Sequence, residues 1–190
     1  MNDTSPLQIG SIELKTRVFT APMAGFSDLP FRTIIRELGR CCPEGEMVSA
    51  NPSLLESEES SRKITFRGEP FPRIAQLLGG HADWMASAAS YVAEKGADLI
   101  DINMGCPAKK ICKMDCGSAL MKNEDAAIAI LEAVVHASKV PVMLKMRTGW
   151  DDNHRNAPKI ASAAEACGIS LITVHGRTRT QGYSGKAEYQ

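Results

Sequence analysis

The chain has 190 residues, of which 44% are hydrophobic, and it carries 22 basic and 22 acidic side chains. A chain of this length and hydrophobic content can bury one sizeable core, so we expect a single domain. The balanced charge gives no overall preference for nucleic acid or for a membrane surface, and any basic binding site must be local. No apolar run approaches the roughly 18 residues of a membrane span, which predicts a soluble protein with no membrane partner.

The sequence has six cysteines, and its first ten residues are polar and lack the apolar segment of a secretory signal. This pattern predicts reduced thiols and a cytoplasmic location. The spacing of Cys106, Cys112 and Cys116 lacks the C-x2-C pair that lets two ligands share a tetrahedral site, and no nearby histidine completes one. We therefore expect no metal centre.

Short apolar runs bounded by proline or glycine alternate along the chain with segments of helical periodicity. The first run is 17–25, and Ser27 is the expected N-cap of a helix that ends before Gly39. A second strand at 46–50 leads through Asn51 and Pro52 into a charged, poorly apolar helix or loop at 53–63. Further strands are predicted at 72–79, 97–107, 141–149 and 170–176, and helices at 82–95, 123–138 and 157–167.

Two of these helices have a clear apolar face. The side chains expected to face the core from 82–95 and 123–138 are Trp84, Met85, Ala88, Tyr91, Val92, Ile128, Leu131, Val134 and Val135.

The strands begin at intervals of roughly 25 to 30 residues, with one longer interval of about 44 residues after the fourth strand. A strand–helix unit that recurs in this way predicts a parallel sheet covered by helices. Two α/β architectures fit, a doubly wound open sheet and a TIM (β/α)8-type barrel. We favour the barrel because polar residues recur near the C-terminal ends of many strands, where barrel enzymes keep their sites. About six strand–helix units are visible, so we expect the barrel to be incomplete.

The stretch 97–107 carries the strongest candidate for chemistry. Strand alternation places Leu99, Asp101 and Asn103 on one face and three apolar side chains on the other. Gly105 allows a sharp turn, so Cys106 should project from the C-terminal end of the strand. A free cysteine is often only a small core residue, but the lysines that follow this one create an electropositive setting that alters thiol reactivity.

Three other strands each carry a polar side chain in a segment otherwise suited to burial, namely Gln76, Lys145 and His175. A buried lysine without a partner is unfavourable or loses its proton, so Lys145 implies an acceptor or an anion in the mouth of the barrel. Gln76 by itself fits a satisfied buried amide better than a ligand contact.

Six segments of the sequence carry a resemblance to a known family. They are APMAGFSDLPFR (21–32), AQLLG (75–79), DINMGCPAKK (101–110), GSALM (117–121), LKMRTGW (144–150) and HGRTRTQGYSGKAEY (175–189). Their order and content resemble the tRNA-dihydrouridine synthases, most closely the B branch of that family. The resemblance implies a TIM-barrel flavoenzyme that reduces a uridine of tRNA to 5,6-dihydrouridine. It implies FMN as cofactor, NADPH as reductant and tRNA as partner, with no obligate protein partner evident.

The family pattern also implies roles for particular residues. The FMN contacts that it implies are Pro22, Met23, Ala24, Gln76, Lys145 and His175. The substrate contacts that it implies are Asn103, Arg147 and Arg177. His175 and Arg177 are also compatible with purely structural hydrogen bonding, and Asn103 with a structural hydrogen bond that stabilises the turn. Its catalytic residue corresponds to Cys106, whose thiol would protonate C5 of the uracil after hydride passes from reduced FMN to C6.

On this pattern, residues 1–190 are expected to form one FMN-binding catalytic barrel domain that lacks the last two strand–helix units and a C-terminal helical tRNA-binding domain. The chain alone is then expected to bind flavin weakly. Two alternatives remain, namely another FMN-dependent TIM-barrel oxidoreductase acting on a small pyrimidine-like substrate, and an inactive fragment that only binds RNA. Basic residues able to contact RNA phosphates are Lys109, Lys110, Lys113, Arg177 and Arg179, although clusters of this size are usually only solvated.

Overall fold

The computed structural model describes residues 5–39 and 41–189. Its main element is a five-stranded parallel sheet in the order β5-β6-β7-β8-β9. The strands are β5 (Met47–Ser49), β6 (Ile74–Leu78), β7 (Leu99–Met104), β8 (Val142–Arg147) and β9 (Leu171–His175). Because neighbours in the sheet follow chain order and run parallel, each connection crosses back over the sheet. This α/β arrangement is that of part of a TIM (β/α)8-type barrel, as the sequence predicts.

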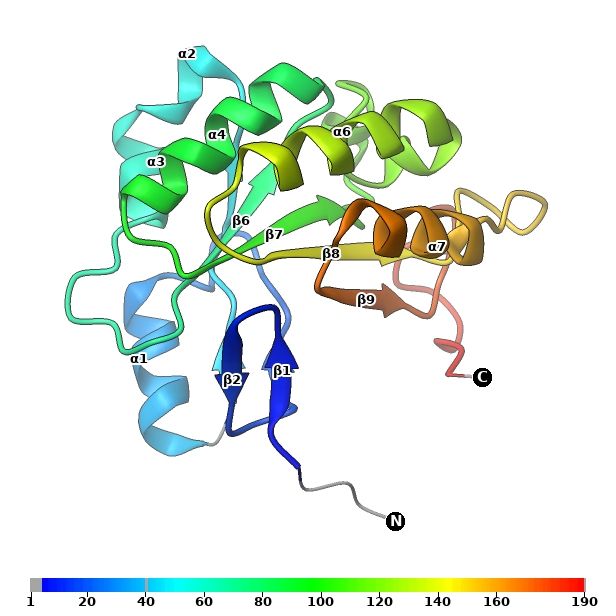
Figure 1. The fold of residues 1–190 in the computed structure, drawn as a ribbon. Helices are drawn as coiled ribbons and strands as arrows, with labels where there is room; N and C mark the ends of the chain where they lie inside the picture. Colours follow the sequence, from blue (N-terminus) through cyan, green and yellow to red (C-terminus); the bar gives the residue numbers. More distant parts are fainter. Residues whose placement is uncertain (1–4, 40, 190) are drawn as a thin grey trace.

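Three helices, α4 (Ala82–Glu94), α6 (Glu124–Ala137) and α7 (Ala157–Cys167), lie along one face of the sheet (Figure 1). The alternate side chains of β7 that face them, including Ile100 and Ile102, are completely buried. The bounds of α7 are those predicted, because Gly168 adopts a left-handed φ of 96° and ends the helix. The side chain of Asn123 caps α6 as expected.

The opposite face of the sheet is closed at its N-terminal end by a hairpin that the sequence analysis does not anticipate. Its strands are β1 (Leu7–Ile9) and β2 (Ile12–Leu14). Their side chains form a second core with the first residues of the central strands, and this core comprises Ile9, Ile12, Leu14, Cys42, Ile74, Leu99 and Met143. Three-residue strands are too short to show a period in the sequence, which is why they escape prediction.

The N-terminal segment departs from expectation in a second way. The strand predicted at 17–25 is only β3 (Phe19–Thr20), and it pairs with the unpredicted β4 (Cys42–Pro43) rather than with the five-stranded sheet. Helix α1 (Leu29–Leu38) is capped by Asp28, so the prediction of Ser27 as N-cap is wrong. The Ser27 hydroxyl is buried and accepts a hydrogen bond from the Met23 N–H at 2.9 Å.

The remaining helical segments are short. The region predicted as a charged helix or loop forms α2 (Pro52–Leu55) and α3 (Glu58–Lys63), and the long segment after β7 forms α5 (Lys109–Cys112) and a 3₁₀ helix, η1 (Gly117–Lys122). Trp84 is 38% exposed rather than facing the core, and Ile130 is buried where Ile128 was expected. In the described part of the chain, no helix is both long enough and apolar enough to cross a bilayer.

Candidate active site

The inner face of the sheet changes from apolar to polar along the strands. In β7, Leu99 lies in the hairpin core, and Asp101 and Asn103 follow on the same face towards the C-terminal end. The register places Gln76 beside Asp101 and Asn103 beside Lys145. Parallel strands end at a common edge, so these polar groups collect there, at the end of the sheet where barrel enzymes carry their sites.

A cavity of about 940 Å³ opens at this edge. The predicted site residues that line it are Pro22, Met23, Ala24, Gln76, Asn103, Cys106, Lys145, Arg147 and His175. Its volume lies within the range of about 300 to 1,000 Å³ that is usual for small-molecule and cofactor sites. The structure therefore brings together, around one cavity, predicted site residues that lie far apart in the sequence. The most distant of them, Pro22 and His175, are separated by 153 positions.

Arg177 is the predicted site residue that does not line this cavity. It lies in the loop after β9, where its Nη2 donates to the carbonyl of Gly185 at 2.7 Å. The expected grouping with the other substrate residues is therefore not seen for Arg177.

A hydrogen-bonded chain of side chains runs beneath the cavity. The Gln76 Nε2 donates to Asp101 Oδ2 at 2.6 Å, and the Asn103 Nδ2 donates to Gln76 Oε1 at 2.7 Å. Asn103 Oδ1 in turn accepts from the N–H of Cys106 at 2.9 Å. Gln76 is 1% exposed and Asn103 8%, so both amides are held in fixed positions. Gln76 keeps one N–H and one lone pair for a ligand, whereas Asn103 also donates to Met47 Sδ at 3.8 Å and its Oδ1 accepts from the N–H groups of both Gly105 and Cys106.

The lining of the cavity is positively charged. Its charged side chains are Lys109, Lys145, Arg147 and Arg179, and none of the described residues that line it carries a carboxylate. The Cys106 thiol is half-buried, and no hydrogen bond to its Sγ occurs within the described residues. An electropositive cavity of this kind favours an anionic ligand or substrate.

Two buried carboxyl groups lie behind this lining. Burial raises the pKa of Asp101 to about 7, while the Gln76 hydrogen bond and the Lys145 charge act in the opposite direction. Burial and the nearby Asp101 raise the pKa of Glu44 well above its usual range, and Lys145 again opposes the change. Lys145 makes no direct ion pair in the described part of the chain, so its ammonium group remains available to the cavity.

His175 presents a neutral ring to the cavity. Burial, together with the charges of Arg147, Lys145 and Arg177, lowers its pKa, so the imidazole is uncharged near neutral pH. Its Nδ1 is buried and has no partner among the described residues. A neutral ring with an unpaired nitrogen can donate to or accept from a bound ligand.

Several lining residues were not anticipated, among them Phe26, Met47 and Tyr183. Met47 begins β5 at the register position opposite Gln76, and Tyr183 belongs to the loop after β9. Such residues carry no chemical signal in the sequence. The residue types by themselves pointed to the polar residue near the end of each apolar strand and to the Cys106 turn, and the resemblance added 22–24.

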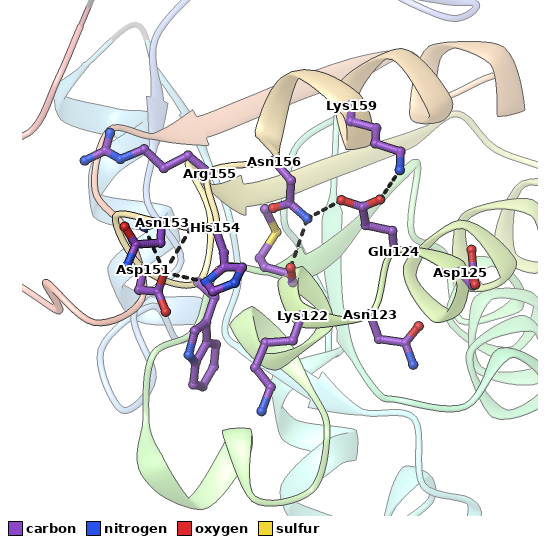
Figure 2. Close-up of a pocket in the computed structure, with 12 residues that line it drawn as sticks. Lys122, Asn123, Glu124, Asp125, Asp151, Asn153, His154, Arg155, Asn156 and Lys159 are labelled. Atoms are coloured by element: carbon purple, nitrogen blue, oxygen red, sulfur yellow. Dashed lines mark hydrogen bonds and ion pairs between the residues drawn. The ribbon is translucent and has the colours of Figure 1, made fainter.

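A second cavity, of about 890 Å³, lies between the start of α6 and the β8–α7 loop (Figure 2). Two contacts between ionisable side chains join parts of its lining, Lys159 with Glu124 and His154 with Asp151. The Trp150 ring contacts two cations, with the Lys122 Nζ at 4.5 Å and the Arg179 Cζ at 4.6 Å from its centre. Arg179 lines the first cavity and Trp150 the second, so this contact joins the two linings.

The fold and site together define a class, an α/β protein of the TIM-barrel type with a cation-lined cavity at the C-terminal edge of its parallel strands. The family model "Dihydrouridine synthase (Dus)" matches residues 19–190. The chain therefore belongs to the dihydrouridine synthase family, which confirms the resemblance read from its motifs.

Curated relatives in several bacteria agree with this assignment. The chain is 49% identical over 183 residues to tRNA-dihydrouridine synthase B of Xanthomonas campestris pv. campestris, covering 96% of this chain and 55% of the relative. It is 49% identical over 185 residues to the protein of the same name in Pseudomonas putida, covering 97% and 55%. For Escherichia coli strain K12 the identity is 47% over 183 residues, covering 96% and 57%. The chain thus spans somewhat more than half the length of these relatives.

Proposed function

We propose that this chain carries the flavin-binding catalytic barrel domain, residues 1–190, of an oxidoreductase that reduces a uridine of tRNA to 5,6-dihydrouridine. The observation that carries the proposal is the single cavity in which Gln76, Lys145 and Cys106 meet. These three residues come from different strands or turns, and convergent polar groups of this kind around one cavity are typical of a ligand-binding site.

The residues around the cavity fit the chemistry of FMN. The backbone at 22–24, the remaining donor and acceptor of Gln76 and the unpaired Nδ1 of His175 can meet the polar edge of a flavin ring. Lys145 would stabilise negative charge on the reduced cofactor. When bound, FMN would supply the hydride for C6 of the uracil ring, with NADPH as the proposed source of its electrons.

Cys106 is the proposed proton donor to C5 of the uracil. Its thiol is free and lies on the cavity lining, where it can reach a base that has left its stack. Asn103 is proposed to orient that base through its Nδ2, which donates to Gln76 and otherwise only to the weak acceptor Met47 Sδ at 3.8 Å, because its Oδ1 already accepts from the N–H groups of Gly105 and Cys106. Arg147 is proposed to offer the substrate its Nη2, which makes no hydrogen bond to the described residues, whereas Arg177 would contact the RNA outside the cavity.

tRNA is the proposed macromolecular partner, and the cytoplasm the proposed location. The lysines of the segment after Cys106, including Lys109 at the cavity, would hold the phosphates beside an extruded uridine.

The proposal is tested with Cys106→Ala in the full-length protein, and Cys167→Ala in α7 is the matched control. We expect Cys106→Ala to retain flavin reduction by NADPH, followed by absorbance, and to lose dihydrouridine formation, followed by nucleoside analysis of tRNA. The control should retain both. Unimpaired dihydrouridine formation by Cys106→Ala would remove the thiol from the mechanism. Normal dihydrouridine in tRNA from a strain lacking the gene would instead favour a small-molecule reductase.

A further inference from the structure

The backbone of the turn that carries the candidate thiol is bonded on every side. The N–H groups of Gly105 and Cys106 donate to Asn103 Oδ1 at 3.1 and 2.9 Å. The Gly105 carbonyl accepts from Arg147 Nε at 2.8 Å. The Cys106 carbonyl accepts from the hydroxyl and the N–H of Ser118 at 2.8 and 3.1 Å. All four backbone polar groups of the two residues are therefore fixed, which leaves the side chain as the free part of the turn.

Arg147 connects this turn to a distant segment. Its Nη1 donates to the carbonyls of Thr178 and Gly182 at 2.9 and 2.8 Å, while its Nε holds Gly105. Its guanidinium also lies 5.6 Å from the ring centre of Tyr183, which lines the cavity. One planar group thus bonds the turn after β7 and the loop after β9, which follows the arrowhead of β9 in Figure 1.

Arg147 makes these contacts from a buried position. It is 2% exposed and has no carboxylate partner among the described residues, so the three carbonyls are what balances its charge. A lysine carries the same charge but lacks the rigid fork that reaches three separate carbonyls. The site therefore uses the shape of the guanidinium and not only its charge.

We propose that Arg147 is a positioning residue that couples the order of the loop at 176–183 to the placement of the Cys106 thiol. The inference rests on the proposed role of Cys106, and it extends that role by adding a link between the thiol and the loop that covers one wall of the cavity. Through this link, a change in the loop reaches the turn that carries the thiol.

The test compares Arg147→Lys with the wild type, and the matched control is Arg73→Lys. Arg73 pairs with Asp98 at the opposite ends of the strands, so the control removes an arginine fork remote from the cavity. The rate of Cys106 alkylation is measured across pH by mass spectrometry of its peptide, and loop opening by chymotryptic cleavage after Tyr183. Neither measurement needs turnover, so this inference can fail independently of the proposed function.

We expect Arg147→Lys to raise both the loop cleavage rate and the plateau rate of Cys106 alkylation about threefold or more, with the pH midpoint of alkylation unchanged. Arg73→Lys should leave both rates at wild-type values. A shifted pH midpoint with an unchanged plateau would show that Arg147 acts through its charge, and would overturn the proposal. A change in only one of the two rates, or in neither, or the same changes in the control, would overturn it as well.

A second experiment avoids substitution. Wild-type protein is treated with chymotrypsin, and the form cut only after Tyr183, which is 77% exposed, is separated from forms cut after the similarly exposed Phe26. The alkylation of Cys106 in this form is then compared with that of uncut protein. Coupling predicts faster alkylation of Cys106 in the cut protein and no change at Cys167. If Arg147→Lys does not fold, this comparison decides the question, and equal rates at Cys106 would refute the coupling.

Discussion

Replacement of Asp101 by asparagine should flatten the pH dependence of folding stability. Asp101 is 2% exposed and accepts a hydrogen bond from Gln76. Asparagine keeps an oxygen for that bond and cannot ionise, so the substitution removes the titration with little change in shape.

The magnitude follows from the shift in proton affinity. Burial raises the pKa of Asp101 from its ordinary 3.8 to about 7. Between these values the folded protein holds a proton that the unfolded chain has lost. Unfolding then releases a proton, and a rise in pH favours unfolding by about 1.4 kcal/mol per pH unit. From about pH 5 to about pH 8, this group should lower wild-type stability by on the order of 3 kcal/mol.

The assay is urea denaturation at a series of pH values, followed by circular dichroism, on wild type, Asp101→Asn and the control Asp125→Asn. Asp125 is exposed at the start of α6, so its replacement should leave the wild-type slope in place. We expect the free energy of unfolding of Asp101→Asn to depend less on pH between about 5 and 8. Wild-type and Asp101→Asn curves of equal slope would refute the conclusion that Asp101 is protonated on folding.

Three further substitutions test the packing and the cavity. Glu69→Ala leaves the buried guanidinium of Arg32 without its carboxylate, so it should lower the free energy of unfolding by about 3 kcal/mol or more. The double variant Arg32→Met/Glu69→Leu should recover most of the lost free energy, because it leaves neither charge buried alone. Urea titration of both variants measures the two free energies. Gly168→Ala should lower the free energy of unfolding, measured by thermal denaturation, by about 1 kcal/mol, because alanine is strained at the Gly168 φ of 96°. Gly39 has a φ of −146°, which alanine adopts readily, so Gly39→Ala should lower it less. Equal losses in the two variants would contradict this explanation. Lys145→Met should weaken FMN binding, measured by flavin fluorescence, about tenfold or more, and unchanged affinity would argue against the proposed contact.

The order of strands and helices was largely predictable because local patterns specify it. The bounds of α7 and the N-cap of α6 follow from glycine and asparagine signals that act within a few residues. The prediction failed where elements were very short, as in the hairpin β1–β2 and in β4, because two or three residues show no period. It also failed at Ser27, since either of two adjacent polar residues could cap the helix and tertiary contacts decided between them.

The candidate site was partly predictable for a similar reason. Alternation along β7 correctly placed Asp101 and Asn103 on one face, with the apolar residues on the other. The involvement of Glu44 was not predictable, because it comes from a segment with no recognisable pattern and its interaction with Asp101 depends on chain packing. The bonding of Arg147 to three backbone carbonyls was hidden for the same reason, because carbonyls are common to every residue.

The sequence by itself determined the family, the parallel strand–helix order and the polar residue at the end of each central strand, because each depends on residue types at short spacing. Only the tertiary structure decided which of these residues share a cavity, that Arg177 lies outside it, and that burial raises the pKa of Asp101 to about 7. Proton affinity and contact depend on what surrounds a group in space, and segments far apart in the chain supply those surroundings.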